Sequence, residues 1–185
     1  MRQNGRTDKQ QKWLEAGYEL FGMYGPNDFK VEKLASLVGQ NKSGFYHYFL
    51  DRESFFVELL KYHEQNSIQF VYEITDLDQF LPGFIDIIIR YQAGVLVQLQ
   101  LRRNQQIAYF KNCYLSVKKR SDAAHLTLWS NYLEIDDPGL ALDLYDIATD
   151  SIIARMKSNQ LNFDFLLGIY EGMRKTVKRL KMSKD

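Results

Sequence analysis

The stretch "NKSGFYHYFLDRESFF", residues 41–56, decides the fold because it places six aromatic side chains in sixteen positions. Phe45 and Phe49 lie four residues apart, so both occupy one face of a helix that begins after Asn41, a residue favoured at helix N-caps. The opposite face carries Lys42, Ser43, Tyr46 and His47. The pattern predicts a short helix that buries phenylalanine and presents a basic, hydrogen-bonding surface to water.

Two more short helices precede this stretch. Residues 8–24 carry one apolar stripe that ends at Gly25-Pro26, and residues 31–38 form two turns closed by Gly39. Three short helices with a tight turn between the second and third are typical of a helix-turn-helix domain. In it, Phe55 and Phe56 are expected in the core. An exposed tyrosine can donate its hydroxyl to a DNA backbone and pack its ring on a thymine methyl, which is one role for Tyr46 and Tyr48. The alternative is that both residues close the rim of the hydrophobic core.

Composition excludes several other classes of protein. The chain has 185 residues, 45% of them apolar, enough for one globular domain or a small domain fused to a larger one. It has no uncharged apolar run of about 18 residues, and "MRQNGRTDKQQ" is too polar for a signal peptide, so we expect a cytoplasmic protein with no membrane partner. Cys113 is the only cysteine and the three histidines are widely spaced, so no disulfide, metal or cofactor is expected.

The remainder of the chain repeats apolar residues every three or four positions, with its three prolines at plausible breaks, which predicts an all-α protein of about nine helices. One long helix is expected from Arg52 to about Ile74. The others are expected at 76–100, with Pro82 near the start, and at 103–119, 122–134, 139–158 and 162–180.

The centre of this second part is rich in aromatic residues. Packing in a three-helix core can account for the rings, and a cavity is the alternative, in which case the ligand is expected to be apolar and planar. The candidate ligand-binding residues are Tyr62, Asn66, Phe70, Tyr91, Tyr109, Tyr114, Trp129 and Tyr132.

The last two helices carry apolar stripes broader than one core needs, and small residues on them permit close approach. Pairing with the same helices of a second subunit explains both features, whereas a monomer that buries both stripes internally is the alternative. The candidate dimerisation residues are Leu144, Ile152, Met156, Phe165, Gly168, Ile169, Gly172 and Met173.

The first sixty residues resemble the TetR family of transcriptional regulators. "WLEAGYELFGMYG" (13–25) is similar to the family's first helix, "VEKLASLVG" (31–39) to its second, and residues 41–56 to its recognition helix. The most specific element is Tyr-His-Tyr-Phe followed by a basic residue three positions on. The resemblance implies a DNA-binding domain over residues 1–51 and a ligand-binding and dimerisation domain over residues 52–185.

The resemblance also implies DNA contacts at individual positions. Lys42 and Ser43 would meet base edges, Gly44 would sit at the close backbone approach, and Tyr46 and His47 would contact phosphate. Arg52 matches a family lysine that touches the DNA backbone. A cation in a first helical turn opposes the helix dipole, which a phosphate partner would explain.

Three positions depart from the family pattern. Gly44 replaces a threonine or alanine and removes a methyl group that can meet a base. Lys30 replaces a capping threonine and can itself reach phosphate. Gly17 replaces an alanine, which either allows close helix packing or weakens the helix.

These features predict a homodimeric, ligand-responsive regulator, a repressor that binds a palindromic DNA operator and is released by a small apolar or aromatic effector. Two alternatives remain. One is a small helical enzyme with His63 or His125 as base, although no nucleophile, paired-carboxylate or phosphate-loop pattern supports it. The other is a helical protein-interaction module built on the last two helices.

Overall fold

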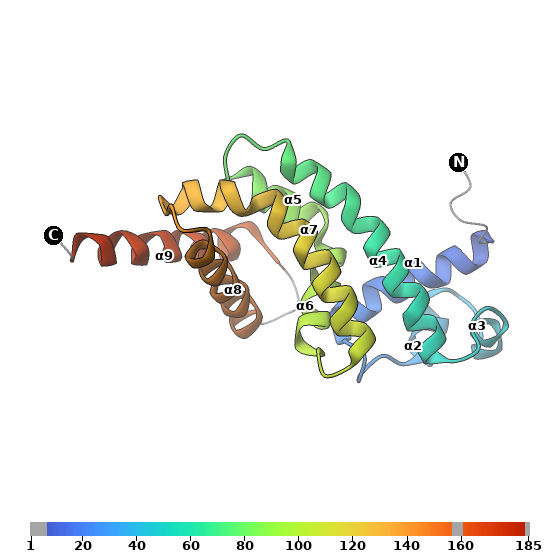
Figure 1. Cartoon of the computed structure of the whole chain (residues 1–185). Helices are drawn as coiled ribbons and strands as arrows, with labels where there is room; N and C mark the ends of the chain where they lie inside the picture. The colour runs from blue at the N-terminus through green and yellow to red at the C-terminus, as the bar shows by residue number, and fades with distance from the viewer. Residues whose placement is uncertain (1–6, 157–160, 184–185) are drawn as a thin grey trace. The chain divides into compact units, whose positions relative to one another are not determined.

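The computed structural model describes residues 7–156 and 161–183, which contain nine α-helices and no β-strand (Figure 1). The predicted all-α class is therefore confirmed. The helices are α1 (Asp8–Tyr24), α2 (Val31–Leu37), α3 (Lys42–Tyr48), α4 (Arg52–Thr75), α5 (Gly83–Arg90), α6 (Gln92–Arg103), α7 (Ala108–Leu133), α8 (Pro138–Arg155) and α9 (Phe163–Met182).

Two sequence predictions about the middle of the chain were wrong. The single helix expected over 76–100 is divided into α5 and α6 at Tyr91, whose N–H closes α5 by donating to the Ile87 carbonyl. Conversely, the helices expected at 103–119 and 122–134 form one helix, α7, because no glycine or proline interrupts its sequence. The two errors cancel in the total number of helices. The end of the helix predicted at 139–158 lies outside the described residues.

Contacts divide the chain into two compact units. Unit 1 contains α1, α2, α3, α4 up to Ser67, and Ala93–Val117; unit 2 contains Ile68–Gln92 and the chain from Lys118 onward. This division begins the second unit inside α4. The functional boundary predicted after residue 51 stays a prediction.

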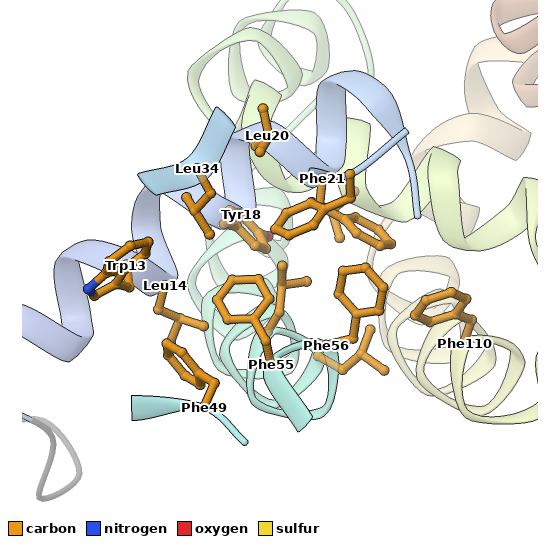
Figure 2. Close-up of a cluster of buried hydrophobic side chains, with 14 of the residues drawn as sticks. Trp13, Leu14, Tyr18, Leu20, Phe21, Leu34, Phe49, Phe55, Phe56 and Phe110 are labelled. Atoms are coloured by element: carbon orange, nitrogen blue, oxygen red, sulfur yellow. The ribbon is translucent and has the colours of Figure 1, made fainter. Parts of the chain in front are cut away.

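Aromatic rings fill the core of unit 1. Phe45, Phe49, Phe55 and Phe56 are all buried, as the sequence predicts. The ring of Phe55 lies 4.9 Å from that of Phe49 and 5.4 Å from that of Phe45, mostly in edge-on or tilted geometries that aromatic pairs favour. Figure 2 shows Phe55 and Phe56 below Tyr18 and Phe21, with Trp13 and Leu14 at one end of the cluster and Phe110 at the other.

Glycines let α1 approach its neighbours closely. A Cβ atom built on Gly17 would lie 2.2 Å from Cζ of Phe55, and one on Gly22 would lie 3.1 Å from Cβ of Leu96 in α6. Gly25, at a φ of 70°, ends α1 and leaves room for the Gln100 side chain, which donates to the Gly22 carbonyl. Of the two roles considered for Gly17, the structure supports close packing.

A largely buried chain of hydrogen bonds joins four helices of unit 1, α1, α4, α6 and α7. The Tyr18 hydroxyl lies 2.7 Å from Nδ1 of His63, and Nε2 of His63 lies 2.9 Å from Oε1 of Gln98. Because the Gln98 oxygen only accepts, Nε2 carries the proton and Nδ1 accepts from Tyr18. The Gln98 amide then donates to the Tyr114 carbonyl. Burial raises the pKa of Tyr18, so the hydroxyl stays neutral.

Unit 2 has an aromatic core of its own. The Phe80 ring lies 4.5 Å from that of Phe84, 5.0 Å from that of Trp129 and 5.2 Å from that of Tyr170. Trp129 satisfies its indole N–H on the Ala141 carbonyl of α8. Helices α8 and α9 pack against each other, and α5 packs against α9. Core packing therefore uses several of the rings that the sequence placed in this region.

Within the described residues, none of the helices taken singly has the length and hydropathy to cross a membrane. The consecutive helices α5 and α6 meet that criterion of length and composition only when taken together.

The contact between Gly17 and Phe55 generates the first prediction. Gly17→Ala should lower the free energy of unfolding by about 1–3 kcal/mol, because the added methyl overlaps a ring that its neighbours hold in place. Urea unfolding followed by circular dichroism measures the change. Glu19→Ala, at an exposed position of the same helix, is the control and should change stability by no more than about 0.5 kcal/mol. If Gly17→Ala and Glu19→Ala lowered the free energy of unfolding equally, the Phe55 ring would leave room for a methyl group at position 17 and the prediction would be wrong.

Candidate nucleic-acid interface

The helix α3 is held in place at its start by a cap and along one face by the core. The Asn41 side-chain oxygen accepts from the Gly44 N–H at 3.0 Å and from the Ser43 hydroxyl at 2.6 Å. Phe45 is fully buried, and its ring contacts Trp13 of α1 at 5.7 Å. The N-cap predicted from the sequence is confirmed, and this anchoring leaves the other face of α3 free to present side chains.

That other face is open to solvent. Lys42, Ser43, Tyr46 and His47 are all exposed, and Tyr46 retains 53% of its accessible surface. Tyr48 is different, because it is half-buried and packs against the core cluster. The rim role therefore fits Tyr48, whereas Tyr46 contacts the core through the ring of Phe45, at 5.3 Å, and keeps about half of its surface in solvent.

Gly44 faces the inside of the unit rather than the open surface. A Cβ atom there would lie 3.3 Å from Cζ2 of Trp13 and 3.7 Å from Oδ1 of Asn41. Glycine thus lets α3 settle closely on α1. A methyl at this position would press first on the tryptophan.

The two predicted phosphate contacts outside α3 differ in their surroundings. Arg52 is exposed, but its guanidinium donates to the Pro26 carbonyl at 3.4 Å and lies 5.7 Å from the Phe56 ring centre. It therefore tethers the turn between α1 and α2. Lys30 is exposed at the N-cap position of α2, and its side chain makes no capping bond.

The acidic partner of Lys42 could not be identified from the sequence. Glu32, in the first turn of α2, forms an ion pair with the Lys42 ammonium, and both side chains are more than half exposed. The hydrogen bond with Lys42 lowers the pKa of Glu32, and the same bond raises the pKa of Lys42. The two residues are ten positions apart in the sequence, so only the packing of α3 against α2 brings them together.

The candidate ligand-binding residues fall into both compact units. Tyr62, Asn66, Tyr109 and Tyr114 belong to unit 1, whereas Phe70, Tyr91, Trp129 and Tyr132 belong to unit 2. In unit 1, the Tyr62 ring packs on Tyr18 at 5.2 Å. In unit 2, the Phe70 ring packs on Tyr91 at 5.7 Å, and Trp129 stacks on Tyr132 at 5.9 Å.

The candidate dimerisation residues lie on α8 and α9 and at the C-terminal cap of α8. Ile152 and Ile169 are buried within the chain, whereas Leu144, Met156, Phe165 and Met173 are half-buried. Gly168 and Gly172 are exposed, and a Cβ atom on either would meet nothing within 4 Å. The exposed Leu140 and Ile147 extend the apolar surface along α8. Part of each stripe therefore remains uncovered within one chain.

The two histidines considered as enzymatic bases are both buried. His63 is engaged by Tyr18 and Gln98, and His125 donates from Nδ1 to the Ser121 carbonyl at 2.6 Å. No group of three or more His, Cys, Asp or Glu side chains is placed to hold a metal ion within residues 7–156 and 161–183.

A short helix anchored by its apolar face, with lysine, serine, tyrosine and histidine on the other, is the arrangement of helix-turn-helix DNA-binding proteins. Residues 14–59 match the sequence model of the family described as bacterial regulatory proteins, tetR family. The chain therefore carries the N-terminal domain of the TetR family, and the resemblance noted in the sequence is confirmed.

Solved structures extend the likeness of fold over nearly the whole chain. A transcriptional regulator (TerR/AcrR family) from Aquifex aeolicus VF5 matches with a TM-score of 0.57 and 19% identity, over 93% of this chain and 99% of that one. A TetR-like transcriptional regulator from Rhodococcus sp. RHA1 matches with a TM-score of 0.59 and 16% identity, over 96% and 97%.

A third structure agrees. A putative TetR-family transcriptional regulator from Mesorhizobium loti MAFF303099 matches with a TM-score of 0.58 and 15% identity, over 95% of this chain and 98% of that one. No curated protein sequence matches the chain. At these identities the structures establish the fold, and they supply no effector or operator.

The buried His125 generates a prediction about pH. Burial lowers its pKa to about 4, from about 6.5 in the unfolded chain. The unfolded state thus takes up a proton first, so this contribution to stability is complete above about pH 6.5 and is lost as the pH falls towards 4. Between pH 6.5 and 5 the loss should be about 2 kcal/mol.

Urea unfolding of the wild type and of His125→Gln at several pH values tests this prediction. The difference in the free energy of unfolding between the wild type and His125→Gln should change with pH between 6.5 and 5, at the rate expected for the uptake of about one proton. Parallel curves would show that His125 does not titrate as its burial indicates.

Proposed function

We propose that the protein is a ligand-responsive transcriptional regulator, a repressor that binds a palindromic operator as a homodimer. The observation that carries the proposal is the exposed face of α3, which displays Lys42, Ser43, Tyr46 and His47 on a rigidly packed support. The functional boundary is proposed after residue 51, with DNA binding before it and effector binding and dimerisation after it. Such a regulator would act in the cytoplasm, where bacterial DNA lies.

In this proposal α3 enters the major groove of one operator half-site. Lys42 and Ser43, at the start of α3, reach base edges, while Gly44 supports them by letting α3 lie close to Trp13 of α1. Tyr46 and His47 bind phosphate, as do Lys30 and Arg52 outside α3. Phosphate contacts supply most of the affinity and make it depend on salt, whereas the few base contacts supply the preference for a sequence.

Dimerisation through α8 and α9 would relate two α3 helices by a two-fold axis, which matches a palindromic operator. The uncovered surface of Gly168, Gly172, Leu140 and Ile147 supports this interface, because glycines without neighbours permit a second copy to approach closely. The half-buried members of the candidate set would be covered by the partner.

Effector binding would favour a dimer whose α3 helices are wrongly spaced for DNA. The effector lowers DNA affinity only as far as it prefers that state, since binding and conformational change are linked. The rings of unit 2 support an apolar or aromatic effector. Of the candidate contacts in unit 2, Phe70, Tyr91 and Tyr132 would offer stacking surfaces, and the buried Trp129 would support Tyr132, on which it stacks. Tyr62, Asn66, Tyr109 and Tyr114 are the candidates in unit 1.

Selection of bound fragments from a random pool of double-stranded DNA, at two salt concentrations, tests the proposal as a whole. An enriched inverted repeat whose affinity falls steeply with salt is the expected result. Absence of enrichment from a purified, effector-free dimer would argue against DNA binding and in favour of an enzyme or a protein-interaction module.

Variants of the DNA-binding face should separate phosphate contacts from base contacts. Arg52→Ala and His47→Ala should weaken binding to all sequences alike, and loss of Arg52 should flatten the salt slope by about 0.9. Ser43→Ala should instead change the base preference at one operator position, by about 1 kcal/mol. Fluorescence anisotropy with operator and random duplexes measures both quantities.

Arg52→Lys is the matched control, because it retains the charge but alters the tether to Pro26. It should keep most of the salt dependence. If all three alanine variants lost sequence preference equally, the separate roles assigned to these residues would be wrong.

The exposed glycines of α9 allow a direct test of the interface. Gly168→Leu with Gly172→Leu should leave a folded monomer, because both glycines are exposed and a Cβ atom on either meets nothing within 4 Å in its own chain. Sedimentation velocity should show the loss of the dimer, and circular dichroism should show that helix content is kept. A dimer as stable as that of the wild type would exclude this face as the interface.

A further inference from the structure

The ion pair between Glu32 and Lys42 places a carboxylate beside the face proposed to bind DNA. Glu32 lies in the first turn of α2 and Lys42 in the first turn of α3. Their side chains remain 60% and 53% exposed, so both are accessible to a partner. A carboxylate close to bound DNA lowers the affinity, because it repels the phosphates. The proposed function assigns Glu32 no role that would offset this cost.

The pair changes what Lys42 can recognise. A free lysine attracts any phosphate, and such contacts account for nearly all non-specific binding. Lys42 and Glu32 taken together carry no net charge, and the carboxylate repels a phosphate that approaches the same ammonium. A guanine edge is uncharged, and its O6 and N7 atoms can accept from an ammonium that has three donors, one of which stays on Glu32. The pair therefore disfavours phosphate more than it disfavours a base edge.

We propose that Glu32 is a specificity-determining residue, which holds Lys42 towards base edges and suppresses its binding to phosphate. Its effect is to lower the affinity for random DNA more than the affinity for the operator. The inference rests on the proposed DNA-binding function of α3.

The test compares Glu32→Gln with the wild type on a random duplex and on the selected operator, across about 50–200 mM salt. Affinity for the random duplex should rise about tenfold, with a salt slope steeper by about 0.9, because Lys42 gains one phosphate contact. Affinity for the operator should rise much less, so the ratio of the two affinities should fall. Glu19→Gln removes the same charge from an exposed position of α1 and should leave the slope close to that of the wild type.

A second background identifies the mechanism. In Lys42→Gln, the further change Glu32→Gln should have no more effect than Glu19→Gln, because the ammonium that Glu32 restrains is gone. An undiminished effect in that background, or equal effects of the two glutamate variants in the wild type, would overturn the inference. So would a loss of operator affinity with unchanged random binding, since Glu32 would then read a base itself. If the wild type bound neither duplex, the proposed function would fail, and that outcome is distinct from the others.

Discussion

Close packing of Phe55 over Gly17 is the constraint on which unit 1 depends. The ring occupies the space that any side chain on Gly17 would need, and it contacts Phe45 and Phe49 on its other sides. The same ring therefore joins α1, α3 and the start of α4. An α3 anchored in this way keeps the orientation of its exposed face, which is the property that groove recognition requires.

The distribution of charge over individual helix faces is more informative in this protein than the net charge of the chain. A net charge of +1 on the whole chain by itself indicates nothing about DNA binding, but the exposed face of α3 concentrates donors, and Lys30 and Arg52 lie near the ends of the neighbouring helices. Some charges are paired within the fold, as Lys42 is with Glu32. Lys118 of α7 contacts Asp122 at 2.6 Å and Asp146 of α8 at 3.1 Å. The charged residues of the sequence therefore indicate a binding partner only after those that form ion pairs inside the fold have been identified.

The sequence predicted the structure correctly where the signal comes from residues a few positions apart in the chain. The bounds of α1 and α3, the Asn41 cap and the buried phenylalanines follow from helical spacing and capping chemistry. The break at Tyr91 did not follow, because no glycine or proline marks it. In the same way, the residues proposed to contact DNA could be assigned to one helix face, but the pairing of Lys42 with Glu32 and of Arg52 with Pro26 depends on contacts between segments ten or more residues apart.

The sequence by itself determined the all-α class, the helix-turn-helix and the exposed face of α3, since each depends on the spacing of residues within one helix or between neighbouring helices. Only the tertiary structure decided which polar groups are satisfied inside the fold. His63, considered as an enzymatic base, lies between Tyr18 and Gln98, and Trp129, a candidate ligand contact, donates to Ala141, so both groups are already bonded. The reason is physical: burial makes an unpaired polar group costly, and its partner is supplied by whichever helix packs nearby, irrespective of distance along the chain.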